Sequence, residues 1–306
     1  MHDILPLGVR IRQTPPATSR LRETTALMTK TSDVGVVVLD TNAIGRLAEP
    51  EYRARAQRGL RAVNLEIRPS FANLMELASN RNANHRTRRL TVVAELMRSG
   101  GLLPGPQDLL RQVGVALVRG VRFVPTLYGF EEVFLTPGTL TPEWVERVRI
   151  NQLKQKERWN KAYDQIRADV QAELREKKLL DKWTSIPDFL EREWMRPERA
   201  GLLMKSMRDG LGLPATLGWD VLSRNETWRL FLEGLGANHY EQCILRDRTK
   251  PAHPADIAQL LYLSVGRPRI LVTRDGGLCR VASAILDRRY ARSRVMHPND
   301  FFPSNH

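Results

Sequence analysis

Two acidic residues stand directly after apolar runs, where carboxylates could meet in a folded chain. Asp40 follows the apolar run 36–39, and Asp275 closely follows a second run, 269–273 (RILVT). Parallel strands joined by helices place their carboxyl ends on one edge of a sheet, so we expect Asp40 and Asp275 to converge there. No residue near Asp40 in the sequence pairs with it, and an unpaired carboxylate near a core is costly. A helix cap, a cation or a metal must therefore offset its charge.

Two further acids belong to helices predicted beside that edge. Glu76 flanks the apolar stripe of one helix, and Asp256 lies in the first turn of another. Taken alone, Glu76 suits a solvated helix surface and Asp256 would stabilise a helix dipole. Four ionised carboxylates can share one site only when cations neutralise them. Such oxygen ligands suit Mg²⁺ or Mn²⁺, either of which can lower the pKa of a bound water and orient it toward a phosphodiester.

The hydrophobic pattern predicts the elements that must position these acids. The run Val36–Leu39 is uninterrupted and mostly β-branched, as in a strand buried on both faces. Thr41-Asn42 after it favours a turn or a helix cap. Apolar residues recur at helical spacing between Phe71 and Ala78, and a late helix is expected over 278–291. Strands alternating with helices predict an α/β fold with a central parallel sheet.

The charge of the chain favours a polyanionic partner. Lys and Arg total 48 against 34 Asp and Glu, which gives a formal net charge of +14. Such an excess is typical of proteins that bind nucleic acid, with a basic protein that lacks such a partner as the alternative. The arginines that could contact phosphates lie in one predicted loop and beside the second strand: Arg81, Arg86, Arg88, Arg89 and Arg274. A solvated basic surface is the ordinary explanation for such a loop.

The cysteines and the apolar content indicate the compartment. The two cysteines, Cys243 and Cys279, form no C-x-x-C pair, which argues against a zinc knuckle or a disulfide framework. This usage favours a reducing, cytoplasmic compartment. No apolar run approaches the roughly 20 residues that span a bilayer, and the N-terminus lacks the apolar segment of a secretory signal. We therefore expect no membrane association.

Composition divides the chain into four segments. Residues 1–33 are rich in Pro, Ser, Thr and Arg and are expected to form an extended arm. Residues 34–99 and 236–306 carry the strand patterns and the four acids. Residues 100–235 contain all six tryptophans and most of the lysines. We expect this segment to be a mainly helical inserted subdomain, whose aromatic residues form a core rather than stack on bases.

The sequence resembles the PIN-domain nucleases, a family that includes the toxin ribonucleases of bacterial toxin–antitoxin pairs. The resemblance lies in the motifs VVVLDTNAIGRL, PSFANLMELA, HPADIAQLLYLSVG and RILVTRDGGL, with SRVMHPNDFF as a terminal strand and its trailer. These motifs fall in roughly residues 34–100 and 236–302, about half of the chain. The resemblance implies an α/β/α sandwich and Mg²⁺- or Mn²⁺-dependent cleavage of RNA, usually single-stranded.

The resemblance also implies roles for individual residues. The catalytic, metal-binding acids are Asp40, Glu76, Asp256 and Asp275, supported by hydrogen bonds from Asn42 and Thr273. Family members often carry a second acid two residues after the last of these, where this chain has Gly277, so lower metal affinity could follow. The 180 residues between Glu76 and Asp256 exclude the size of a compact toxin. The expected roles of the insertion are to select substrate, to bind a partner or to cover the site.

Other functions stay open from the sequence. A PIN-like domain could bind nucleic acid or a protein partner without cutting, although the intact set of acids argues against this. A haloacid-dehalogenase-type phosphatase needs a second Asp two residues after the first, where this chain has Asn42. Serine- or cysteine-hydrolase chemistry has little support, because the chain has no G-x-S-x-G and its six histidines show no H-E-x-x-H spacing. RNA is the expected partner; DNA cleavage, a protein inhibitor and self-association are left undecided.

Overall fold

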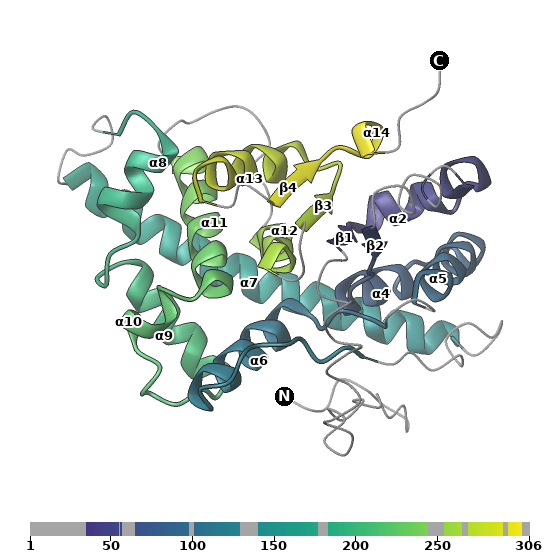
Figure 1. Ribbon diagram of the computed structural model, residues 1–306, viewed down its shortest axis with the longest axis horizontal. Helices are drawn as coiled ribbons and strands as arrows, with labels where there is room; N and C mark the ends of the chain where they lie inside the picture. The colour runs from purple at the N-terminus through teal and green to yellow at the C-terminus, as the bar shows by residue number, and fades with distance from the viewer. Residues whose placement is uncertain are drawn as a thin grey trace, which may run out of the picture.

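A computed structural model describes residues 35–54, 56, 65–97, 101–128, 140–176, 183–243, 254–264, 269–289 and 293–301. The arm expected over residues 1–33 lies outside these ranges. Within them, a four-stranded sheet contains β1 (Gly35–Leu39), β2 (Leu65–Ile67), β3 (Arg269–Val272) and β4 (Ser293–Met296), in the order β2-β1-β3-β4 (Figure 1). Every neighbouring pair is parallel, which confirms the α/β class and the parallel sheet predicted from the sequence.

Three strands end level with one another. Leu39 of β1 pairs with Val272 of β3, and Val272 pairs in turn with Met296 of β4. The pairing extends one step further, because the Asp40 N–H donates to the Val272 carbonyl at 2.9 Å and the Thr273 N–H donates to the Met296 carbonyl at 3.0 Å. We call this end of the sheet the carboxyl edge. The residues that follow β1, β3 and β4 therefore all emerge at the carboxyl edge.

Helices make up most of the remaining described residues (Figure 1). The α-helices are α2 (Thr41–Leu47), α4 (Phe71–Ala78), α5 (Ala83–Met97), α6 (Pro106–Val118), α7 (Pro142–Glu176), α8 (Ile186–Phe189), α9 (Ala200–Gly210), α10 (Trp219–Leu222), α11 (Glu226–Cys243), α12 (Pro254–Ile257), α13 (Gly276–Arg289) and α14 (Pro298–Phe301). The π-helix η2 (Leu190–Trp194) continues α8, and the 3-10 helix η3 (Ala258–Ser264) continues α12.

Helices cover both faces of the sheet because successive residues of β1 point to opposite sides. Val37 and Leu39 pack in one core with α2, α4 and α5. Val36 and Val38 pack in a second core with α6, α11, η3 and α13. All five residues of β1 are buried, as its unbroken apolar run predicted. The strand before Asp40 is therefore held on both sides by apolar contacts, which fixes where Asp40 leaves the sheet.

The sheet continues, by single bridges, into the segment predicted as the insertion. Leu103 bridges in parallel to Ser70, beyond the end of β2, and Leu102 bridges in antiparallel fashion to Tyr128. The Leu103 N–H donates to the Pro69 carbonyl at 2.9 Å, and its own carbonyl accepts from the Phe71 N–H at 2.8 Å. Leu103, which lies close to the boundary predicted at residue 100, thus forms hydrogen bonds to the backbone at the start of α4.

The helical segment shares its core with the sheet. Trp183, Trp194 and Trp228 are buried in the same cluster as Val36 and Val38, which confirms for these tryptophans that they form core. Helix α11 is buried through most of its length and runs without a break across the boundary predicted at residue 235. The sheet and the helices therefore meet in one continuous apolar cluster.

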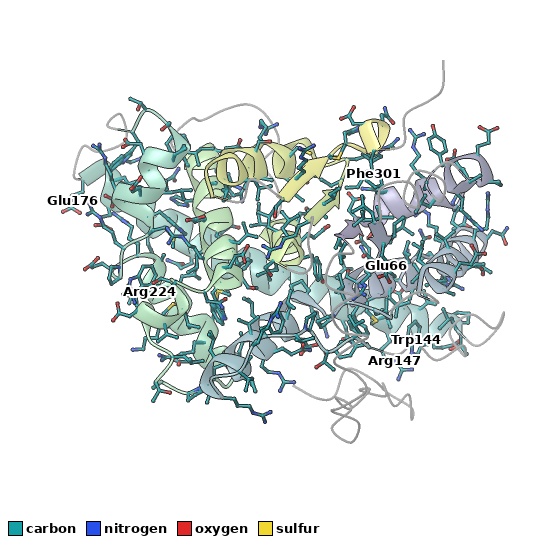
Figure 2. All side chains as sticks on the ribbon, viewed as in Figure 1. Glu66, Trp144, Arg147, Glu176, Arg224 and Phe301 are labelled. Carbon is teal, nitrogen blue, oxygen red and sulfur yellow. The ribbon has the colours of Figure 1, made fainter. Side chains whose placement is uncertain are left out.

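Helix α7 links the two ends of the molecule. Its residues Trp144 and Glu176 lie at opposite sides of the view in Figure 2. At one end, Trp144 packs with Ala78 of α4. At the other end, Glu173 forms an ion pair with Arg199 at 2.9 Å. None of the described helices combines the length and apolarity needed to span a bilayer.

Candidate active site

Asp40 is the centre of the candidate site. It leaves β1 at the carboxyl edge and caps α2, because its Oδ1 accepts from the Ala43 N–H at 2.6 Å. Its Oδ2 accepts from the Thr273 hydroxyl at 2.7 Å and from the Arg274 N–H at 3.3 Å. The residue is only 5% exposed. A helix cap thus supplies one of the three solutions that the sequence left open for this carboxylate.

The surroundings of Asp40 disfavour its ionised form. Burial raises the pKa of Asp40 above its ordinary value, the hydrogen bonds from Thr273, Ala43 and Arg274 oppose that rise, and the negative charge of Glu76 adds to it. The hydrogen bonds therefore offset only part of the desolvation of the carboxylate. A positive charge nearby would stabilise the ionised form.

Glu76 lies beside Asp40 through Thr41. Its Oε2 accepts from the Thr41 hydroxyl at 2.6 Å, and Thr41 is the residue directly after Asp40. Glu76 is exposed, as the ordinary reading of a helix-surface residue predicted, yet it is tied to the carboxyl edge rather than extended into solvent. The negative charge of Glu76 also contributes to the raised pKa of Asp40, while their sharing of a metal stays a prediction.

Thr273 joins Asp40 to Asp275. Its hydroxyl donates to Asp40 and accepts from the Asp275 N–H at 3.0 Å. The Asp275 Oδ1 accepts from the Leu278 N–H at 3.0 Å, in the first turn of α13. Thr273 thus makes the hydrogen bond to a carboxylate that was expected of it, while its role in supporting a metal site stays a prediction. Asn42 is exposed in the first turn of α2, and its supporting role stays a prediction.

Asp256 is half-buried in the first turn of α12. The far end of η3, which continues α12, lies at the start of β4, because the Ser293 hydroxyl donates to the Leu263 carbonyl at 3.5 Å. The end of η3 therefore lies at the edge of the sheet opposite the carboxyl edge. The place of Asp256 beside the other acids and its role as a ligand stay predictions.

The predicted metal cluster is not assembled as a ligand set. Among the described residues, no three acidic, histidine or cysteine side chains lie close enough together to hold a metal ion as they stand. Part of the reason lies in the hydrogen bonds of Asp40, Glu76 and Asp275, whose oxygens face donors in helix starts and hydroxyl groups. Like charges also keep carboxylates apart when no cation neutralises them.

Two residues near the acids of the carboxyl edge, Cys279 and Asp300, were not predicted from the sequence. Burial and the negative charges of Asp275, Asp40 and Asp300 raise the pKa of the half-buried Cys279 thiol, while Arg280 opposes the rise. Cys279 therefore lies within electrostatic range of three acids at the carboxyl edge. Asp300 lies in α14, directly after β4. The signal that could have found it is the one used for Asp40, namely an acid shortly after a strand pattern.

The prediction of a basic loop was wrong for Arg86, Arg88 and Arg89, which lie in α5. The arginines predicted to bind phosphate differ in their contacts. Arg81 contacts Glu146 of α7 at 3.3 Å, and the Arg86 guanidinium donates to the Asn80 carbonyl at 2.7 Å. The Arg89 guanidinium lies against Gly45 of α2, where an added Cβ would be 3.2 Å from it. The side chains of Arg88 and Arg274 are exposed. Contact between these arginines and nucleic acid stays a prediction.

Comparisons with known proteins add no relative. No protein-family model, curated protein or solved structure matches the chain. The resemblance to PIN-domain nucleases therefore rests on the sequence motifs quoted above.

Proposed function

We propose that the protein is a metal-dependent ribonuclease with a PIN-like α/β/α fold. The observation that carries the proposal is the setting of Asp40, a buried carboxylate at the carboxyl edge with a raised pKa and with Glu76 close enough to raise it further. Asp275 emerges from the neighbouring strand and is joined to Asp40 through Thr273. This is the negative, oxygen-rich environment that attracts a hard divalent cation.

The residues present fit such an ion in their chemistry. Asp40, Glu76 and Asp275, with Asp256 from α12, would hold Mg²⁺ or Mn²⁺ through carboxylate oxygens. When bound, the ion supplies a water of lowered pKa and charge stabilisation for the leaving oxyanion of a phosphodiester. The same binding would offset the burial that raises the pKa of Asp40 and would relieve the smaller repulsion from Glu76.

The chain's own side chains would orient the metal-binding carboxylate and hold the RNA backbone. Thr273 fixes the orientation of the Asp40 carboxylate, and the α2 cap keeps its other oxygen in place. Exposed Arg88 and Arg274 would hold the RNA backbone by charge, consistent with the net charge of +14. RNA, with DNA as the competing substrate, is the partner that this arrangement fits, and the compartment proposed is the cytoplasm.

A second candidate function has one observation in its favour. Because no three metal-binding side chains are assembled among the described residues, a PIN-like protein that binds nucleic acid or a protein partner without cutting is the alternative. The two proposals differ in whether divalent metal produces cleavage.

The deciding experiment is cleavage of a mixed RNA and DNA panel with Mn²⁺ or Mg²⁺. We expect the wild type to cut RNA, EDTA to stop the reaction, and Asp40→Asn to abolish it. Asp220→Asn is a matched control, because Asp220 is exposed on α10 and belongs to no part of the site. A folded wild type that binds the panel but cuts none of it with either metal would favour the non-cleaving alternative.

A further inference from the structure

A buried polar pair begins the helix that carries Glu76. The Ser70 hydroxyl oxygen accepts from the Asn73 N–H at 3.2 Å, and the Ser70 N–H donates to the Asn73 Oδ1 at 2.9 Å. This reciprocal arrangement is a capping box, with Asn at the position where Glu or Gln is usual. Ser70 and Asn73 are 1% and 4% exposed. The Asn73 amide is therefore shielded from bulk solvent.

The hydrogen bonds fix which way the Asn73 amide points. Its oxygen receives the Ser70 N–H and also the Ser70 hydroxyl, at 2.8 Å. A backbone N–H can only donate, so the amide oxygen must face it and the amide NH₂ must face the other way. On that other side lies the Thr41 hydroxyl oxygen, 3.5 Å from the Asn73 Nδ2. Asn73 is therefore a donor toward Thr41.

The direction of the next hydrogen bond follows from the first. The Thr41 hydroxyl has one proton and lone pairs that accept. Since Asn73 can offer Thr41 only a donor, the Thr41 proton is directed to the Glu76 Oε2 at 2.6 Å. Ser70, Asn73, Thr41 and Glu76 form a one-way chain of donors that ends on a carboxylate. We call this the Asn73 relay.

The Asn73 relay is anchored in the core. The Tyr262 hydroxyl of η3 donates to the Pro104 carbonyl at 3.0 Å. Burial raises the pKa of Tyr262, and the Ser70 side chain opposes that rise. Since η3 continues α12, the relay connects the helix of Glu76 to the element that carries Asp256.

We infer that Asn73 is a positioning residue for the divalent metal, acting on Glu76 through Thr41; this rests on the proposed function. A glutamate on an exposed helix surface has several rotamers available, and most of them point into solvent. The Asn73 relay selects the one in which the carboxylate accepts from Thr41, the residue directly after Asp40. Ligands held in this way by outer hydrogen bonds bind metal more tightly, and loss of the outer partner typically costs about 10- to 100-fold in metal affinity or activity.

The test measures Mn²⁺ binding without substrate, by calorimetry or by the loss of the free Mn²⁺ electron-spin-resonance signal. We expect Thr41→Val, which keeps the shape and removes the hydroxyl, to weaken binding about tenfold or more. Thr41→Ser keeps the hydroxyl and should bind like the wild type. In cleavage assays, Thr41→Val should need more Mn²⁺ for half-maximal rate and approach the wild-type rate at saturation.

Asn73→Ala and Ser70→Ala separate positioning from helix capping. Both break the capping box, but only Asn73→Ala removes the donor to Thr41. We expect Asn73→Ala alone to weaken Mn²⁺ binding about tenfold, with both variants confirmed as folded by circular dichroism. Equal weakening in the two variants, or wild-type binding in Thr41→Val, would overturn the inference while leaving the proposed function intact. A wild type that binds no Mn²⁺ would overturn both.

Discussion

Replacing Thr273 by Val should reveal how strongly the carboxyl edge depends on one hydroxyl. Thr273 is 1% exposed, and Val has nearly its shape, so the substitution removes the hydrogen bonds to Asp40 and Asp275 without opening a large cavity. A hydrogen bond to a charged group contributes about 1.5–3 kcal/mol. We therefore expect a loss of about 2 kcal/mol in the free energy of unfolding at neutral pH.

The loss in the free energy of unfolding caused by Thr273→Val should grow as the pH rises. Burial holds the pKa of Asp40 above its ordinary value in the folded state, so the stability contributed by protonated Asp40 is present at low pH and lost as the pH rises through the folded pKa. Without the Thr273 hydroxyl the pKa rises further, because that hydrogen bond favours the ionised form. The Val variant should lose more stability than the wild type between pH 4 and pH 7.

The assay is urea unfolding at several pH values together with a pH–rate profile for RNA cleavage. One pKa unit corresponds to about 1.36 kcal/mol, so the loss of about 2 kcal/mol should move the acid limb of the profile up by about 1.5 pH units. Thr273→Ser keeps the hydroxyl and is the matched control. Identical profiles and an identical stability difference at pH 4 and pH 7 for Val and Ser would refute the assigned role of this hydroxyl.

Three further results are expected. Asp275→Ala should abolish cleavage yet keep the circular dichroism spectrum, because the loss of one negative charge from the carboxyl edge compensates part of the lost α13 cap. Metal-dependent cleavage at the wild-type rate in this variant would show that Asp275 is not part of the site. RNA binding should weaken steeply with salt, and the double variant Arg88→Ala/Arg274→Ala should reduce the slope of log K against log salt by about 1.4, because each lost contact with single-stranded RNA removes about 0.7; an unchanged slope would exclude both arginines from the interface. Gly236→Ala should lower the free energy of unfolding by about 1–3 kcal/mol through overpacking, because the added Cβ would press on Trp194 and lie 2.6 Å from the Leu190 side chain; a melting temperature equal to that of the wild type would contradict this packing.

The strands were predictable because a short, unbroken run of apolar residues indicates a buried strand without any information from distant residues. The unbroken run before Asp40 became a strand buried at all five positions, and the run before Asp275 became its parallel neighbour. Parallel pairing then places the residues after both strands on one edge whatever the loops do. That rule is sufficient to predict from the sequence that the residues Asp40 and Asp275 lie at the carboxyl edge.

The hydrogen bonds of the site were less predictable because they depend on contacts distant in sequence. The hydroxyl of Thr41 reaches Glu76 35 residues away, and Thr273 reaches Asp40 across 233 residues. No local pattern shows that Asn73, inside an apolar helix stripe, faces Thr41 rather than solvent. The division at residue 235 was drawn from composition, which does not record that α11 packs along the sheet core throughout.

The same carboxylates serve the fold and the proposed chemistry, and their two oxygens divide the tasks. In Asp40, Oδ1 caps α2 while Oδ2 faces Thr273 and Arg274 across the strand gap. In Asp275, Oδ1 caps α13, and its second oxygen has no hydrogen-bond partner within the described part of the chain. Capping costs a carboxylate only one oxygen, so an acid can be fixed in direction by the backbone and still offer an oxygen to a cation. Because caps lie where strands pass into helices at the carboxyl edge, an α/β fold of this kind places rigid carboxylates there as a consequence of ending its strands.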